Sequence, residues 1–164
     1  MVADGVHILL AIALVYLCFR TTDAGPYLVA GLGASVPDVD MYLFRPLIEL
    51  GYVDGVVWGH RGATHSVFMG LLLVALVAMV GPWRPAALGF GSHVTFDLVT
   101  GGVRLFAPAS AALVGVSGGW LLFNLLATIV AATVLVTAIV RMNPGPERFV
   151  APELLPTAVS DRIG

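Results

Sequence analysis

The sequence predicts an all-α fold, a polytopic membrane helix bundle of about four to five helices. The first observation is composition, because 59% of the 164 residues are hydrophobic and 11% are charged, with a mean hydropathy of +0.96. A soluble domain needs roughly a quarter of its residues charged to cover its surface. The second observation is that long apolar runs alternate with short breaks rich in glycine and proline.

The chain is long enough for one domain and too short for two. We expect a membrane-embedded domain over residues 1–141 and a polar C-terminal tail over residues 142–164. The N-terminus has neither a basic region nor a small-residue cleavage site, so we read it as part of the mature protein. Cys18 is the single cysteine, which excludes an internal disulfide, and the lack of any basic run argues against nucleic acid as a partner.

Two short apolar runs open the chain. Residues 6–19 end at Arg20, and residues 27–36 end at Pro37; both are shorter than the about 20 residues that a spanning helix needs. Helices this short indicate a bundle with a polar cavity that reaches partway into the membrane. Residues 41–52 have apolar positions at mixed spacing, and we interpret them as an interfacial or re-entrant segment.

Longer apolar runs follow. Residues 64–80 and 86–99 predict two helices, with Trp and Arg at positions 83–84 as interfacial anchors between them. Residues 111–140 predict one long tilted span that starts near Gly118.

The arginines suggest an orientation. If successive helices alternate in direction, five arginines fall on one side of the membrane: Arg20, Arg84, Arg141, Arg148 and Arg162. Three fall on the other: Arg45, Arg61 and Arg104. Positive charge accumulates on the cytoplasmic side, so we expect the N-terminus outside and the C-terminus inside.

His93 and Asp97 are the sharpest chemical signal. Positions i and i+4 share one helix face, so the imidazole and the carboxylate can converge on one ion. Such groups in the apolar body of a membrane helix are costly unless they are paired or coordinated. A metal role and a structural pair remain equally open from this motif alone.

Asp38 and Asp40 follow Pro37. In an extended segment after proline, two carboxylates at this spacing point to the same side. They would repel each other unless a proton or a cation lies between them, which a divalent metal ion would satisfy. The competing interpretation is a helix N-cap followed by a solvated charge.

The segment His60 to Ser66 precedes the helix over residues 64–80. We expect His65 in the first helical turn, where the helix N-terminus disfavours its protonation and leaves the neutral imidazole that a metal needs. The plainer interpretations are interfacial anchoring for His60 and for His7, and N-capping for Thr64.

Taken together, these groups predict a metal site near one membrane interface. The ligand candidates are His7, Asp38, Asp40, His60, His65, His93 and Asp97. Histidine and carboxylate ligands without thiolates suit Zn²⁺, with Mn²⁺ or Fe²⁺ as alternatives, and their number exceeds what one tetrahedral ion requires. The usual chemistry of such a cluster is activation of water against a phosphoester or a related bond.

The same motifs carry a family resemblance. His7, PDVD at 37–40, HRGATHS at 60–66 and SHVTFDLVT at 92–100 resemble the YdjM-like family of bacterial and archaeal inner-membrane proteins, regarded as metal-dependent hydrolases. That family is distantly similar to the zinc-dependent phospholipase C and nuclease P1 group. The resemblance implies a hydrolase in the inner membrane, acting on a phosphoester of a lipid or lipid-linked substrate. Ala63 stands where the family commonly has an aromatic residue.

We assign further roles around the metal. Arg61 would clamp an anionic group of the substrate and stabilise developing charge. Thr64 and Ser66 would orient the residues around the ligands, and His60 or His65 would protonate the leaving group if it is not itself a ligand.

Two other functions use the same residues. One is a non-catalytic membrane protein that binds or moves a metal ion, since intramembrane histidines and aspartates also mark ion paths. The other is a scaffold that the metal only holds together. An ion path would need polar groups that continue to the far side, which disfavours transport, because the polar groups cluster on one side. A homodimer is left open.

Overall fold

A computed structural model describes residues 3–116 and 118–142, and in these residues the fold is all-α, as predicted. The elements in chain order are α1 Ala3–Phe19, α2 Ala24–Ser35, η1 Pro37–Val39, α3 Asp40–Glu49, α4 Gly55–Trp58, η2 Ala63–His65, α5 Val67–Ala78, α6 Trp83–Thr100 and α7 Trp120–Met142, where η marks a 3₁₀ turn. The seven α-helices exceed the four to five predicted, because α3 and α4 are short extra helices. Apart from Met142, which ends α7, the predicted tail lies outside the described residues.

Each predicted apolar run is a helix, but two boundaries were wrong. α5 begins at Val67 rather than at residue 64, because the hydroxyl of Ser66 accepts a hydrogen bond from the amide of Met69 and caps the helix. α6 begins at Trp83 rather than at residue 86, since Pro85 lies in the first turn, where a missing amide hydrogen costs nothing. The predicted interfacial anchors are therefore helical residues.

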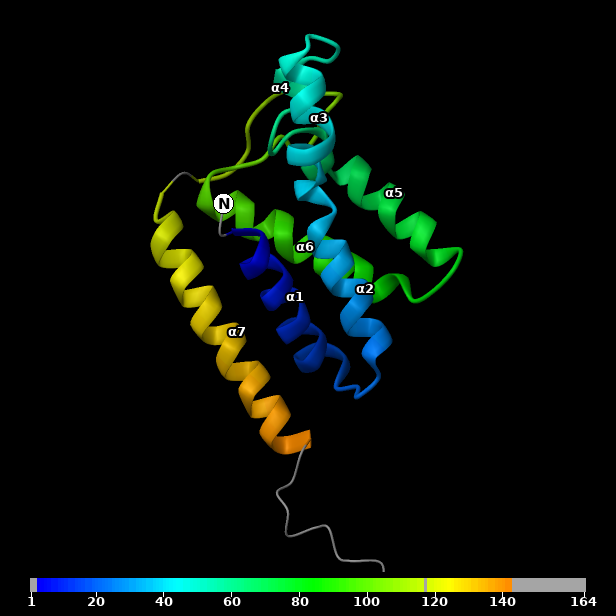
Figure 1. Cartoon of the computed structure of the whole chain (residues 1–164), viewed down its shortest axis with the longest axis vertical. Coiled ribbons are helices and arrows are strands. Elements are labelled where there is room, and N and C mark those ends of the chain that lie inside the picture. Colours follow the sequence, from blue (N-terminus) through cyan, green and yellow to red (C-terminus); the bar gives the residue numbers. More distant parts are fainter. Residues whose placement is uncertain (1–2, 117, 143–164) are drawn as a thin grey trace, which may run out of the picture.

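The helices α1, α2 and α6 form the centre of the molecule, and α5 and α7 pack on its outside (Figure 1). The closest approach is between α2 and α6. A Cβ atom on Gly89 would lie 2.9 Å from the backbone carbonyl carbon of Ala30, and one on Gly33 would lie 2.7 Å from the backbone oxygen of Ala86. Small residues at both positions let the two backbones meet, as is common between membrane helices.

One end of this bundle is polar. The N-terminus lies beside the C-terminal end of α6, and α3 and α4 stack at the same end (Figure 1). α1 begins there, α2 ends there in η1, α5 follows η2, and α6 ends there. We call this the site end, defined by the start of α1, η1, η2 and the end of α6.

Among the described helices, α7 is the one with the length and apolar composition to cross a membrane. It packs on α1, and its buried residues Asn124, Ala131 and Ala138 are spaced seven apart, so they lie on one seam. Gly5–Phe19 and Val67–Ala78 are apolar but shorter. Length alone therefore establishes one candidate span and leaves the polytopic arrangement as a proposal.

Candidate metal centre

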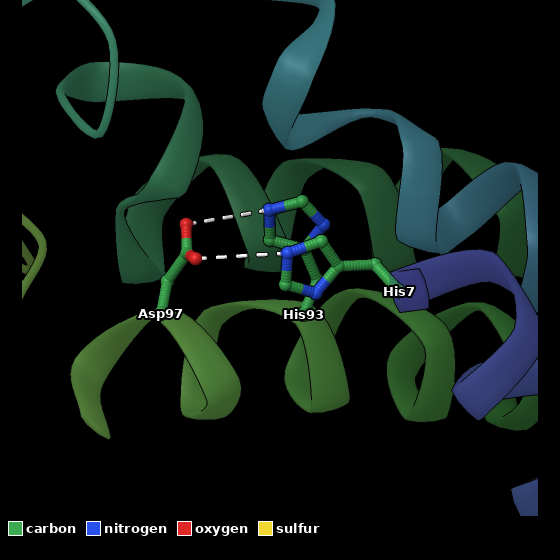
Figure 2. A group of neighbouring side chains, drawn as sticks. All are labelled: His7, His93 and Asp97. Atoms are coloured by element: carbon green, nitrogen blue, oxygen red, sulfur yellow. Dashed lines mark ion pairs between the residues drawn. The ribbon is translucent and has the colours of Figure 1, made fainter. Parts of the chain in front are cut away.

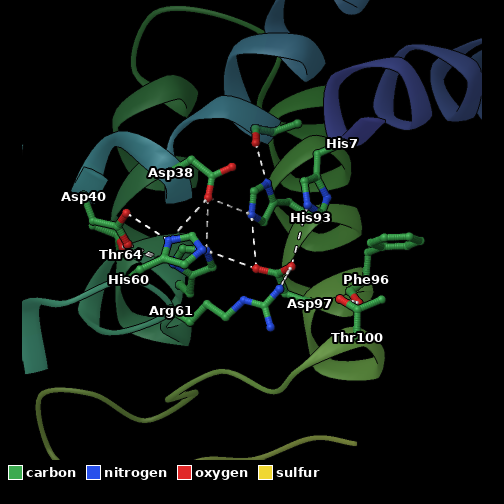
Figure 3. Close-up of polar contacts among 12 residues, drawn as sticks. His7, Asp38, Asp40, His60, Arg61, Thr64, His93, Phe96, Asp97 and Thr100 are labelled. Atoms are coloured by element: carbon green, nitrogen blue, oxygen red, sulfur yellow. Dashed lines mark hydrogen bonds and ion pairs between the residues drawn. The ribbon is translucent and has the colours of Figure 1, made fainter. Parts of the chain in front are cut away.

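All seven predicted metal ligands meet at the site end (Figure 3). They form three overlapping groups that could each hold an ion: His7 with His93 and Asp97, Asp38 with His65 and His93, and Asp40 with His60 and His65. Every one of these residues is buried except His60, whose side chain is 46% exposed. They come from α1, η1, the start of α3, the turn before η2, η2 itself and the second half of α6, which all face the site end.

His93 is held by the neighbouring helix. Its Nδ1 donates a hydrogen bond of 2.7 Å to the backbone oxygen of Ala34 on α2, so in the neutral imidazole it is Nε2 that carries the lone pair. This Nε2 lies 3.6 Å from Oδ1 of Asp38 and 3.5 Å from Oδ2 of Asp97. The imidazole is therefore oriented by the protein on one side and presents a lone pair to two carboxylates on the other.

His65 is arranged in the same way. Its Nδ1 lies 3.1 Å from the hydroxyl of Thr64 and 3.5 Å from Oδ2 of Asp40, and Thr64 donates a 2.8 Å hydrogen bond to that same Asp40 oxygen. Its Nε2 lies 3.2 Å from Oδ2 of Asp97 and 3.6 Å from Oδ1 of Asp38. A carboxylate behind an imidazole is the usual way in which metal-binding histidines are oriented.

Four donor atoms thus converge: Nε2 of His65, Nε2 of His93, Oδ1 of Asp38 and Oδ2 of Asp97. A tetrahedral ion with bonds of about 2.0–2.1 Å has ligand atoms about 3.3–3.4 Å apart. The four nitrogen–oxygen separations in this set run from 3.2 to 3.6 Å. In the described residues both Nε2 atoms are buried and face these carboxylate oxygens, and Asp38, His65 and His93 form one of the three groups that could hold a divalent ion.

The charge on His65 differs from the expectation. Burial alone would lower the pKa of His65, but hydrogen bonds to Asp38, Asp40 and Asp97 raise it to about 10. Burial alone would likewise raise the pKa of Asp40, and hydrogen bonds from His60, His65 and Thr64 instead hold it well below its usual range. The expectation of a neutral imidazole was wrong for the protein without metal, because carboxylates outweigh the nearby helix end. A bound cation would take the place of this proton.

His7 extends the cluster towards α1. Its ring stacks on that of His93, with ring centroids 3.8 Å apart, and its Nε2 lies 3.6 Å from Oδ1 of Asp97 (Figure 2). Its Nδ1 is buried and has no hydrogen-bond partner among the described residues. Asp97 therefore faces His7 with one oxygen and the two central histidines with the other, the position from which a carboxylate bridges two ions.

His60 lies at the mouth of the cluster. Its Nδ1 is 3.2 Å from Oδ1 of Asp40 and 3.8 Å from Oδ1 of Asp38. Because its side chain is much more exposed than those of the other six residues, it is the one positioned to meet a molecule that enters from outside.

Arg61 is fixed on several sides. Its Nη2 donates a 2.9 Å hydrogen bond to Oδ1 of Asp97, and its backbone oxygen accepts one of 2.8 Å from the amide of Arg104. Its φ of +63° costs a residue with a side chain about 1–2 kcal/mol. Its guanidinium also lies so close to Gly101 that a Cβ atom there would overlap it. A strained backbone held by this many contacts is typical of a functional residue.

Three local expectations need correction. Asp38 and Asp40 do not lie in an extended segment, because η1 and the start of α3 hold them, yet both carboxylates still face the histidines. Thr64 is not a helix N-cap, and it bonds Asp40 instead. Ser66 is the cap: its described hydrogen bonds go to the backbone of Ala63 and Met69, so it organises the start of α5 and does not orient a ligand.

The family comparison agrees with the motifs. Residues 1–159 match the model of a family described as YdjM inner membrane protein. The chain belongs to the YdjM family. This confirms the resemblance predicted from the motifs and makes the chain a member of a family of inner membrane proteins. No curated protein and no solved structure matches it.

Sequence reasoning missed several residues of this YdjM protein that shape the centre. The backbone oxygen of Ala34 orients His93, and a backbone acceptor has no signal in the sequence. Gly101 makes room for Arg61, although a glycine at a helix end indicates only a cap. Phe96 packs edge-on against His7, although in the sequence it is only an apolar neighbour of Asp97 with no pattern that points to the centre.

Proposed function

We propose that the protein is an integral membrane metal-dependent hydrolase that cleaves a phosphoester of a lipid or lipid-linked substrate. The observation that carries this proposal is the set of four buried donor atoms from His65, His93, Asp38 and Asp97. Two imidazole nitrogens and two carboxylate oxygens suit Zn²⁺ best once the ion takes the place of the proton on His65, with Mn²⁺ or Fe²⁺ as alternatives. When bound, the ion would act as a Lewis acid and lower the pKa of a water molecule that could attack the phosphoester.

Arg61 would bind the anionic oxygens of the substrate. Its side chain is 20% exposed while its Nη2 contacts Asp97, so the residue connects the centre with the outside. A planar guanidinium can bind two phosphate oxygens at once, which fixes the phosphoester relative to the ligands. The strained backbone supports this role, because simple pairing with Asp97 would not require it.

His60 would hold the proton that the leaving group needs. A general acid must reach the substrate, and the half-exposed imidazole of His60 meets this condition, whereas the side chain of His65 is fully buried. Asp40 accepts a hydrogen bond from Nδ1 of His60, which leaves Nε2 as the ring nitrogen that would face the leaving group. Of the two histidines that the sequence left open for this task, the geometry supports His60.

The membrane placement is part of the proposal. Besides α7, we place α1, α2, α5 and α6 in the bilayer, because large apolar side chains such as Leu32, Leu71 and Leu76 are more than half exposed and need an apolar surrounding. The site end then lies near one interface, with the N-terminus outside and the C-terminus inside. A reporter enzyme fused after Gly164 that works only outside the cytoplasm would contradict this orientation.

The deciding experiment is elemental analysis of the detergent-purified protein beside Asp97→Ala and the double variant His93→Ala/Asp97→Ala. We expect at least one equivalent of Zn²⁺ or Mn²⁺ in the wild type and none in the variants, followed by hydrolysis of phospholipid or lipid-phosphate substrates. Glu49→Gln, in the exposed Arg45–Glu49 pair, is the matched control and should retain metal.

Two results separate the alternatives. Metal without turnover on any phosphoester would select a metal-binding scaffold, and metal-dependent ion flux in vesicles would select transport. A protein that takes up no divalent ion after reconstitution would overturn the proposal.

A further inference from the structure

An apolar cavity of about 440 Å³ lies between α1 and α6. The residues that matter for its shape are Leu10 and Leu14 on α1, and Leu88, Ser92, Phe96 and Val99 on α6. Its volume lies within the range of about 300–1,000 Å³ that is usual for small-molecule sites. It runs along both helices, so its long axis follows the helix direction.

One end of this groove reaches the candidate metal centre. Phe96 lines the groove and packs edge-on against His7, with ring centroids 5.3 Å apart (Figure 3). Val99 lines the same end, and two residues later Gly101 contacts the guanidinium of Arg61. The groove therefore ends near the part of α6 that meets His7 and, two residues further on, the partly exposed cation of Arg61, an arrangement that would complement an amphiphile with an anionic head.

We propose that this groove binds one hydrocarbon chain of a membrane lipid whose phosphate lies at Arg61, with Phe96 as the wall between the chain and His7. This inference rests on the proposed function and specifies its substrate as an anionic lipid that enters sideways from the bilayer. The chain contributes contact with apolar walls, and Arg61 fixes the head, so neither part alone would hold the lipid in this position.

The other grooves lack this connection. The cavity between α5 and α6 is lined by Val67, Val74 and Leu105, and in the described part of the chain its lining has no aromatic contact with a cluster residue such as the one between Phe96 and His7. The cavity among α1, α2 and α7 is lined by Tyr16, Tyr27 and Met142, at the end of α1 opposite to His7. Both serve as internal controls, because they face the same surroundings without reaching Arg61.

The test uses the full chain in vesicles of phosphatidylcholine that contain a phosphatidic acid with a diazirine in its acyl chain. Light activation should label Leu10, Leu14 and Phe96 more strongly than the residues of the two control cavities. Ser92→Phe fills the groove and should reduce this labelling several-fold. Val74→Phe, which narrows the α5–α6 cavity, should leave it unchanged. Val99→Phe provides a second filling variant, because Val99 lines this groove but not the α5–α6 cavity and its side chain is 39% exposed.

The head is tested separately. Arg61→Gln should lower labelling by the phosphatidic acid but not by a neutral diacylglycerol with the same diazirine. Equal labelling of all three cavities, or labelling that ignores both Ser92→Phe and Arg61→Gln, would overturn the inference. So would crosslinks from Leu14 to a second copy of the chain, which would make the groove a dimer interface.

Labelling requires neither metal nor turnover, so the two proposals fail separately. Specific labelling by a protein that takes up no metal would leave the groove as a lipid site and remove the hydrolase. Hydrolysis of a water-soluble phosphoester without groove labelling would support the hydrolase and remove the groove as a lipid site.

Discussion

Two arginines with left-handed backbones mark opposite ends of the molecule. Arg20 has a φ of +49° and Arg61 a φ of +63°. Arg20 is exposed and follows α1, where a residue in this conformation simply ends a helix. Arg61 bonds Asp97 and lies against Gly101. The same backbone conformation therefore ends a helix at Arg20, whereas at Arg61 it directs a guanidinium towards Asp97.

The polar contacts around the two arginines also differ between the two ends of the molecule. At the end with Arg20, Tyr27 donates a hydrogen bond to the backbone of Thr21, and Asp23 precedes α2 without capping it through its side chain. At the site end, polar side chains bond one another instead and are buried. Buried polar networks are costly to leave incomplete, so changes at the site end should matter far more than matched changes at the other end.

The largest expected effect is on metal retention. His65→Ala removes one of the four converging donors and the partner of three carboxylates, so we expect the purified protein to lose its bound metal and all turnover. Tyr27→Phe removes a hydrogen bond at the opposite end and should cost about 1 kcal/mol of stability with metal unchanged. Elemental analysis and thermal unfolding of both variants check this, and metal-replete His65→Ala would contradict it.

The next effect is on turnover. Arg61→Gly keeps the backbone conformation but removes the guanidinium, and we expect kcat to fall by about 10²–10³, the usual effect of losing a charge-stabilising donor. Arg20→Gly relieves the same strain at the opposite end and should stabilise the protein by about 1 kcal/mol without changing kcat. Similar kinetics for the two variants would remove the distinction between the arginines.

A smaller effect is expected behind the ligands. Asp40→Asn weakens the orientation of His65 and Thr64, so metal affinity should fall by about 10–100-fold. Asp23→Asn is the matched change at the opposite end and should leave affinity unaltered. Competition with a fluorescent chelator measures both affinities, and equal values would show that Asp40 does not support the centre.

The smallest effect tests how Arg61 is placed. Gly101→Ala puts a methyl group where the guanidinium lies, so we expect a several-fold lower kcat with metal content unchanged. Gly81→Ala adds the same group at the turn before α6, where a Cβ atom meets nothing within 4 Å, and kcat should not change. Wild-type kinetics for Gly101→Ala would mean that the guanidinium is free to move aside.

The helices and the membership of the centre could be predicted from the sequence, whereas the geometry of the centre could not. Apolar runs bounded by Gly and Pro predicted the helices, and four histidines and three aspartates within or beside those runs were the seven candidates. The 3₁₀ turn at Asp38 and the positive φ of Arg61 depend on contacts between distant segments, and local propensity does not report these. The same holds for His65, whose charge follows from three carboxylates on other elements.

The pairing of His7 with Asp97 has a consequence for biosynthesis. His7 lies in α1 and Asp97 near the end of α6, so the centre joins segments that leave the ribosome at different times. In the proposed membrane placement, while α1 and α2 wait for α6, the imidazole of His7 and the carboxylate of Asp38 have no complete set of partners. These two helices would therefore be held in place by their own packing, such as Ala11 and Val15 against Ala30 and Ala34, until α6 arrives. Capture of the proposed ion would then be a late event that locks an arrangement already made.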